Sequence, residues 1–216
     1  MNTLIVSGGN IDLTFLEDYC SNNVIQTIIA VDKGLESLYK LNITPNHIVG
    51  DLDSVDMDIF NYYMNNPNIQ IHKYIPEKDF TDTDIALNLA ISLHSTNITI
   101  IGAIGTRIDH TLANIHILTN ALNANIPCQL IDKNNKIYLI DKPITLQKSK
   151  TYGKYISLIP LTSSVCGLTL KGFKYALEDY SFVVGKSLGI SNEITHDCAS
   201  IELEHGILIV IECRDL

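Results

Sequence analysis

The 216-residue sequence has no tryptophan, only five cysteines and few basic side chains, and each shortage narrows the range of functions. Lysine and arginine total 15 against 24 aspartates and glutamates, which gives a formal net charge of −9. A general nucleic-acid-binding protein needs a basic face to neutralise phosphates, so this charge argues against that class. A nucleotide substrate stays compatible with it, because metal ions can mediate between carboxylates and phosphates.

Long apolar runs are also missing, and no stretch approaches the ~20 residues of a membrane-spanning helix. The N-terminal MNTLIVSGGN has no basic region and only a short apolar run, so it predicts a first strand rather than a signal peptide. The odd number of cysteines fits no complete disulfide framework, and none forms a Cys-x-x-Cys pair. We expect a cytoplasmic protein with reduced, buried thiols and no membrane partner.

The first part of the chain alternates short apolar runs with segments of helical periodicity. Expected strands cover 4–6, 27–31, 47–50, 69–74, 98–105 and 128–131, and expected helices cover 12–19, 35–41, 56–64, 82–94 and 110–123. Nearly all-apolar strands between helices are typical of a mostly parallel sheet with helices on both faces. We therefore predict an α/β domain over residues 1–133.

Residues 134–216 are predicted to form a smaller all-β domain, a sandwich or partial barrel, because strand-like runs alternate with turn residues and no convincing helix occurs. The runs cover 136–141, 155–160, 168–173, 199–204 and 207–212. The last two are joined by His205-Gly206, which suits a tight hairpin with positive φ at glycine.

Acidic side chains follow several of the expected strands of the α/β domain. In an open α/β sheet, ligands bind outside the carboxyl ends of the strands. Each of the following groups falls at a strand-to-helix junction: Asp32; Asp51 and Asp53; Asp79, Asp82 and Asp84; Arg107 and Asp109. By contrast, Ser7-Gly8-Gly9-Asn10 after the first strand is no Gly-x-Gly-x-x-Gly fingerprint, so a nucleotide is not expected to be held in the common dinucleotide manner.

The segment GDLDS at 50–54 favours a metal site. In an extended segment Asp51 and Asp53 point to the same side, and two hard carboxylates on one face suit Mg²⁺, which commonly bridges to substrate phosphates. The alternative is that Asp53 or Ser54 merely caps the helix expected near Asp56. Capping explains one of these residues, not both aspartates after a glycine.

The segment DFTDTD at 79–84 favours helix capping and metal binding equally. Thr81 followed by Asp84 is close to a capping box, and acids in a first helical turn favour the helix dipole. The roles are compatible, since Thr81 and Asp84 can cap the helix while Asp79 or Asp82 faces the cleft.

The segment GAIGTRIDH at 102–110 combines a glycine turn, a cation and a carboxylate. Arginine holds phosphate oxygens through paired donors, and the charge that develops in phosphoryl transfer needs such a partner. The alternative is a surface pair of Arg107 with Asp109, with Asp109 as the helix N-cap. His110 and Asn114 lie i, i+4 and share a helix face, but this spacing does not decide whether His110 is a ligand.

Together with VDKG at 31–34, these three segments resemble, in order, the motifs of thiamine pyrophosphokinases, and LGISNE at 188–193 resembles that family's thiamine-side motif. The likeness covers essentially the whole chain. It implies a homodimeric enzyme that transfers the diphosphate of ATP to the thiamine hydroxyl and releases AMP. Its α/β domain would bind ATP and Mg²⁺, and its β domain would bind thiamine.

The resemblance also implies roles for individual residues. Asp51, Asp53 and Asp82 would hold Mg²⁺ with Asp32 at the same acidic centre, Arg107 would lie near phosphate, and Asp109 near the thiamine hydroxyl, which it orients or deprotonates. Ser191 and Asn192 would hydrogen-bond the aminopyrimidine, and Asp79, Thr81 and His110 complete the candidate substrate-binding set.

The sequence departs from the family pattern at one residue. The family often has a second glycine where this sequence has Lys33, which either reaches the nucleotide phosphates or points to solvent. Any aromatic face for the cationic thiazolium must come from Phe or Tyr, since tryptophan is absent.

Two other functions remain as alternatives. A pyrophosphokinase for another alcohol, such as a hydroxymethylpterin, would need a pocket other than Ser191-Asn192. A non-catalytic thiamine- or nucleotide-binding protein would need no acidic centre.

Overall fold

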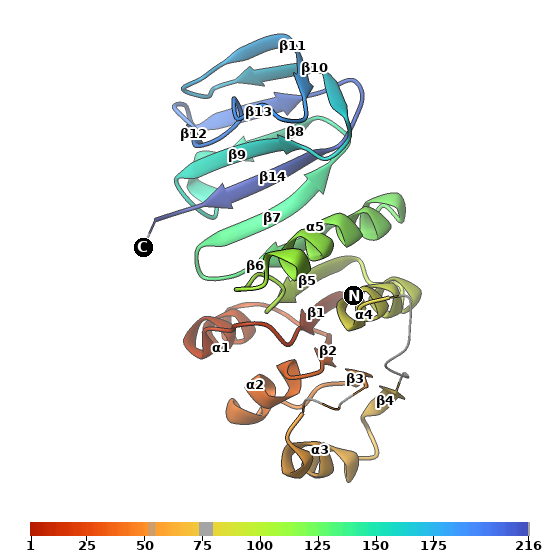
Figure 1. The fold of residues 1–216 in the computed structure, drawn as a ribbon. Coiled ribbons are helices and arrows are strands. Elements are labelled where there is room, and N and C mark those ends of the chain that lie inside the picture. Colours follow the sequence, from red (N-terminus) through yellow and green to blue (C-terminus); the bar gives the residue numbers. More distant parts are fainter. Residues whose placement is uncertain (52, 54, 74–79, 216) are drawn as a thin grey trace. The chain divides into compact units, whose positions relative to one another are not determined.

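The structure is a computed structural model that describes residues 1–51, 53, 55–73 and 80–215. Its contacts divide the chain into two compact units, Met1–Lys133 and Asn134–Leu216 (Figure 1). The first is an α/β unit and the second is built of antiparallel strands. The predicted fold class is confirmed.

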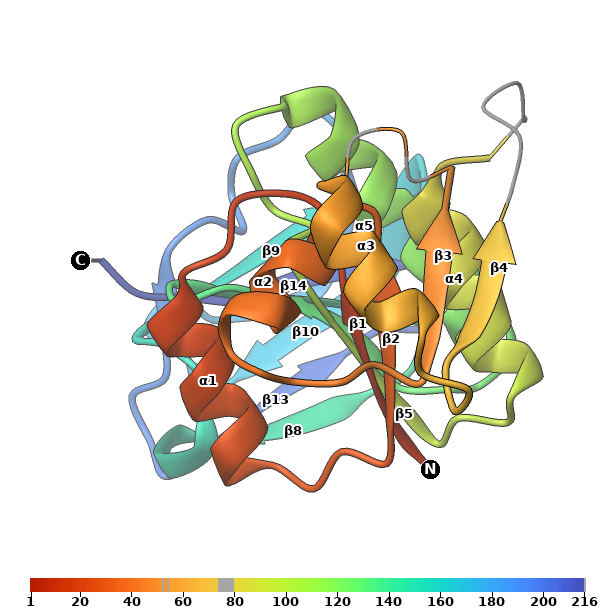
Figure 2. The same ribbon diagram turned by 90° about the horizontal axis from the view of Figure 1, so that it is seen from below.

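The first unit is a parallel sheet with helices on both faces. Its strands are β1 (Asn2–Val6), β2 (Thr27–Val31), β3 (His47–Gly50), β4 (Gln70–Lys73), β5 (Asn97–Ile101) and β6 (Cys128–Ile131), in the order β6-β5-β1-β2-β3-β4. Its helices are α1 (Leu13–Asn22), α2 (Gly34–Lys40), α3 (Met57–Met64), α4 (Asp82–Ser92) and α5 (Ile108–Asn123). Figure 2 shows α1, α2 and α3 on one side of the sheet and α4 and α5 behind it.

The sheet is buried on both faces, which explains its nearly all-apolar strands. Successive strand residues point to opposite faces, so Leu4 and Val6 pack with Leu35 and Leu38 of α2 in one core. Ile5, between them in the chain, is equally buried on the other face. Burying each such side chain contributes about 1.5–3 kcal/mol, so these runs can only be interior strands.

The strand order fixes where a ligand can bind. The chain winds from β1 through β2 and β3 to β4 in one direction, then returns to β5 and β6 on the other side of β1. The winding therefore reverses between β1 and β5. The crevice beyond the carboxyl ends of strands at such a reversal is where open α/β sheets bind ligands.

The second unit is a sandwich of two antiparallel sheets. Its strands are β7 (Asn135–Ile140), β8 (Ile144–Gln147), β9 (Tyr155–Pro160), β10 (Ser164–Lys171), β11 (Leu177–Val183), β12 (Asn192–Glu193), β13 (Cys198–Glu202) and β14 (Leu208–Cys213), with a short 3-10 helix at Lys148–Lys150. One sheet has the order β12-β9-β14-β7 and the other β11-β10-β13-β8. Side chains from both sheets, such as Leu158 and Val210 with Leu168 and Phe182, form one core. Strands β8, β11 and β12 were not predicted.

The predicted hairpin at His205-Gly206 is wrong. Strand β13 pairs with β10 and β8, whereas β14 pairs with β7 and β9, so the chain crosses from one sheet to the other at this point. Gly206 does have a positive φ of +101°, and a Cβ there would meet the Ser164 carbonyl at the start of β10. Glycine at this position lets the chain pass close to β10 as it crosses from one sheet to the other.

All five cysteines are free thiols, and the expectation that they are buried is wrong, since Cys198 is exposed and the other four are half-buried. Among the described residues, no helix is long and apolar enough to span a membrane.

The buried His47 and its half-buried neighbour His72, at the sheet edge, predict a loss of stability in mild acid. His47 Nδ1 and His72 Nε2 lie 3.1 Å apart, and burial, with the charge of His72, lowers the pKa of His47. The unfolded chain therefore takes up this proton first as the pH falls, so unfolding becomes easier below about pH 6.5, by at most about 1.4 kcal/mol per pH unit.

Urea unfolding at pH 7.5 and pH 5.5 tests this expectation. The wild-type free energy of unfolding should fall more between the two pH values than that of His47→Gln. Equal falls in the two proteins would mean that the pair does not carry the pH dependence.

Candidate functional site

A cavity of about 620 Å³ lies at the reversal point of the sheet. It is formed by the loops that follow β1, β2 and β5 and by the first turns of α4 and α5. Five predicted site residues line it: Asp32, Thr81, Asp82, Arg107 and His110. These five residues come from three of the predicted strand-to-helix junctions, those after β2, β4 and β5. Asp51 and Asp53, from the predicted junction after β3, are not among the lining residues.

The loop after β1 forms part of this cavity, although it was not predicted from the sequence to belong to the site. The Ser7 amide donates to the Ile101 carbonyl at 2.8 Å, and the Gly9 amide donates to the Gly102 carbonyl at 2.9 Å. A Cβ on Gly9 would overlap that carbonyl, so only glycine lets the two loops approach. The Ser7 and Thr83 hydroxyls lie 2.7 Å apart and tie the loop to α4. Two glycines directly after the first strand were the available signal.

The predicted pairing of His110 with Asn114 on one helix face is confirmed, because both line the cavity. Asn114 is buried, and its Nδ2 donates to the Ala103 carbonyl at 2.8 Å. Asn114 therefore fixes the loop after β5 to α5, while His110 is part of the cavity wall.

Asp32 and the Asp51 segment meet beside this cavity. Gly50 has a φ of +146°, and a Cβ there would overlap the Asp32 carboxylate, so that carboxylate lies directly against Gly50. The Asp53 amide donates to Asp51 Oδ1 at 3.1 Å. The Asp32 carboxylate at the end of β2 therefore lies against the residue that precedes Asp51 at the end of β3.

The capping alternative for Asp53 is wrong, because Asp56 caps α3. Asp56 Oδ1 accepts from the amides of Asp58 at 2.8 Å and Ile59 at 3.4 Å. The other capping candidate, Ser54, lies outside the described residues. Asp53 is thus available for another role.

The donor chemistry of this acidic group fits Mg²⁺, which takes carboxylate oxygens. Within the described ranges, no three or more His, Cys, Asp or Glu side chains are grouped so that they could hold a metal ion. Mg²⁺ usually keeps several waters and binds proteins through one or two carboxylates plus substrate phosphates. The group therefore fits an ion that arrives with a phosphate ligand. Asp79 lies outside the described residues.

Thr81 caps α4, as one of the two equal predictions held. Its Oγ1 accepts from the Asp84 amide at 3.3 Å. The Asp84 carboxylate accepts from Asn88 at 2.8 Å and Asn120 at 3.0 Å, which ties α4 to α5. Asp84 is therefore structural, whereas Asp82 lines the cavity. Capping by Thr81 is therefore confirmed, whereas metal binding by this segment stays a prediction.

Arg107 and Asp109 form the predicted surface pair, with Arg107 Nη2 2.6 Å from Asp109 Oδ2. Asp109 is not the N-cap of α5, because the helix already begins at Ile108. The hydrogen bond from Arg107, followed by the one from the His110 amide, lowers the pKa of Asp109 to about 2. Both partners are well exposed, so either can exchange the other for a ligand.

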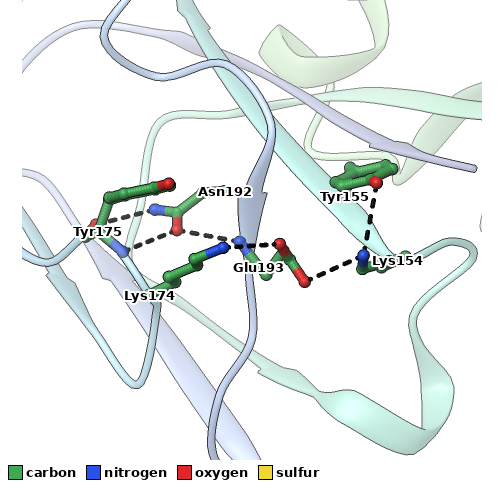
Figure 3. Close-up of polar contacts among 6 residues, drawn as sticks. All are labelled: Lys154, Tyr155, Lys174, Tyr175, Asn192 and Glu193. Atoms are coloured by element: carbon green, nitrogen blue, oxygen red, sulfur yellow. Dashed lines mark hydrogen bonds and ion pairs between the residues drawn. The ribbon is translucent and has the colours of Figure 1, made fainter.

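In the β unit, the Asn192 side chain is buried and hydrogen-bonds to backbone groups of the protein (Figure 3). It is only 5% exposed. Its Oδ1 accepts from the amides of Tyr175 and Glu193, both at 3.0 Å, and its Nδ2 donates to the Tyr175 carbonyl at 2.8 Å. Asn192 therefore fixes the backbone of Tyr175, whose side chain remains exposed. Glu193 pairs with Lys174 and Lys154 at 3.2 and 3.4 Å.

Ser191 differs from its neighbour. It is exposed and has a φ of +57°, and its amide donates to Ser157 Oγ at 3.0 Å. Among the residues that the structure describes, its hydroxyl has no hydrogen-bond partner. Of the two predicted aminopyrimidine contacts, Ser191 has the free polar group.

Two family models match this chain. The thiamin pyrophosphokinase catalytic domain matches residues 19–130, and the thiamin pyrophosphokinase vitamin B1 binding domain matches residues 142–208. A curated thiamine pyrophosphokinase of Bacillus subtilis is 37% identical over 188 residues, which cover 87% of each chain.

Solved structures agree with these matches. A crystal structure of thiamine pyrophosphokinase from Bacillus subtilis has a TM-score of 0.89 and 33% identity over all of both chains. Yeast thiamin pyrophosphokinase has a TM-score of 0.81 at 20% identity over 98% of this chain and 86% of that one, which supports the fold alone.

Proposed function

Because the chain belongs to the thiamine pyrophosphokinase family, we propose that it transfers the diphosphate of ATP to the thiamine hydroxyl and releases AMP. The family consists of ATP:thiamine diphosphotransferases. The observation that carries the proposal is the cavity at the reversal point, where a glycine loop, Asp82 and Arg107 meet. These matches do not favour a hydroxymethylpterin pyrophosphokinase or a non-catalytic binding protein.

The nucleotide phosphates are proposed to lie over Gly8 and Gly9, where the absence of side chains lets a ligand approach the backbone closely. Asp51, Asp53 and Asp82 would hold Mg²⁺, with Asp32 at the same centre. When bound, the ion would offset charge on the phosphates that are transferred. Catalysis then rests mostly on positioning and electrostatics.

Asp109 is proposed to orient the thiamine hydroxyl rather than to deprotonate it. A carboxylate with a pKa of about 2 is a weak base near neutral pH. Arg107 would keep this pair, which it makes through Nε and Nη2, and would offer its remaining N–H donors to a phosphate oxygen. Thr81 and His110 line the same cavity and complete its polar wall.

The β unit is proposed to bind thiamine through Ser191, and the protein is proposed to act as a homodimer in the cytoplasm. Leu188 and Ile190, which precede Ser191 in the same motif, are 52% and 45% exposed. Neighbouring exposed apolar side chains mark surfaces that a ligand or a second subunit covers. Five free thiols fit a reducing compartment.

Incubation with thiamine and Mg-ATP, followed by chromatographic separation, tests the reaction. We expect thiamine diphosphate and AMP in equal amounts, and no product when EDTA removes the metal. A parallel incubation with a hydroxymethylpterin should give no transfer. Formation of ADP and thiamine monophosphate would overturn the proposal, because it would show transfer of a single phosphoryl group.

A further inference from the structure

Lys33 is a cation in the wall of the cavity, directly after Asp32 at the end of β2. It is exposed, and its ammonium group has no ion-pair or hydrogen-bond partner among the residues that the structure describes. The other cation of the lining, Arg107, is already paired with Asp109. Lys33 is therefore the cavity cation whose charge no described side chain offsets.

The backbone places Lys33 beside the glycine loop. A Cβ on Gly34 would overlap the Val6 carbonyl, so the chain after Lys33 passes directly against the end of β1. A Cβ on Gly8 would lie 3.3 Å from the Lys33 amide nitrogen and 3.5 Å from its Cβ. The side chain of Lys33 thus starts next to the surface of Gly8.

The carboxylates of the cavity make the positive charge of Lys33 important for binding a phosphate. Asp32 and Asp82 line the same cavity and would repel a polyanion. A metal ion can offset these carboxylates, but a phosphate that lies over Gly8 also needs a donor from the protein. An ammonium group binds phosphate as a point charge through charge-assisted hydrogen bonds.

We propose that Lys33 binds the polyphosphate of the nucleotide over the glycine loop and so makes this cavity prefer nucleoside triphosphates over monophosphates. The inference rests on the proposed function, which places a nucleotide in this cavity. It assigns to this chain a phosphate contact at a position where the family often has glycine.

Calorimetric titration of ATP and of AMP, with Mg²⁺ and without thiamine, tests the inference. Lys33→Gln should weaken ATP binding about tenfold, as expected for a lost hydrogen bond to a charged group, and change AMP binding little. Lys33→Arg should keep most of the ATP affinity because it keeps the charge. Lys40→Gln is the matched control and should bind ATP like the wild type. It removes an exposed lysine from the last turn of α2, the helix that begins directly after Lys33.

Three results would overturn the inference: unchanged ATP affinity in Lys33→Gln, an equal loss for AMP and ATP, or no ATP binding by the wild type. The titrations do not depend on transfer, so they separate this inference from the proposed reaction. A wild type that forms no thiamine diphosphate but loses ATP affinity through Lys33→Gln would contradict only the reaction. A wild type that forms the product while Lys33→Gln binds ATP normally would contradict only the role of Lys33.

Discussion

Replacing Asp51 or Asp53 with asparagine is expected to lower kcat by roughly a hundred- to a thousandfold. A neutral amide is a poorer ligand for a hard cation than a carboxylate, and the charge that stabilises the metal is lost. Steady-state kinetics at saturating thiamine and Mg-ATP measures the effect. The far-UV circular dichroism spectrum should stay unchanged, because Asp51 is half-buried and Asp53 exposed, so neither side chain belongs to the core.

Asp56→Asn is the matched control for these two variants. It lies in the same segment, but it caps α3, and asparagine caps a helix about as well as aspartate. We expect nearly normal activity from this variant. If Asp53→Asn also kept normal activity at moderate Mg²⁺ concentration, Asp53 would not be a metal ligand, and the acidic centre would reduce to Asp51, Asp82 and Asp32.

The buried strands of the α/β unit could be predicted from the sequence because burial on both faces leaves little choice of residue. The runs 27–31, 47–50 and 128–131 coincide with β2, β3 and β6. The prediction of β5 ran on to residue 105, whereas the strand ends at Ile101, because Gly102 turns the chain with a φ of +78°. An apolar run alone does not show where its backbone leaves the sheet.

The order of the strands was not predictable in the same way, and the missed part of the site follows from it. Local periodicity shows that β1 is a strand, but not that β5 lies beside it. Only this pairing brings Gly9 against Gly102 and makes the loop after β1 part of the cavity. The hairpin at His205-Gly206 failed for the same reason, because the pairing partners of β13 and β14 lie far away in the sequence.

Ser191 and Asn192 differ in side-chain burial, which could not be predicted from the sequence. Ser191 and Asn192 are adjacent polar residues in one motif, and both were predicted to contact the aminopyrimidine. The pairing of β12 with β9 turns Asn192 inward to Tyr175 and leaves Ser191 exposed. A direct contact is therefore a sharper prediction for Ser191, whereas Asn192 acts by fixing the backbone around Tyr175.

Alanine variants of these two residues should consequently differ in kind. Ser191→Ala removes an exposed hydroxyl and should lower kcat/KM for thiamine by about ten- to a hundredfold, mainly through KM, with little loss of stability. Asn192→Ala leaves the Tyr175 amide and carbonyl without their partner and should lower the free energy of unfolding by about 2–4 kcal/mol. It should also raise the KM for thiamine, because Tyr175 and its neighbours lose their fixed position. The KM for ATP should change little in either variant.

Glu193→Gln is the matched control for both variants. It changes the next residue of β12 but keeps its size, and it disturbs only exposed ion pairs, which contribute little to stability. Urea unfolding and kinetics with each substrate varied in turn measure the two effects separately. A stability loss in Ser191→Ala equal to that in Asn192→Ala would show that Ser191 is structural. If Ser191→Ala instead raised the KM for ATP and left that for thiamine unchanged, the β unit would not be the thiamine side, even if the reaction itself were correct.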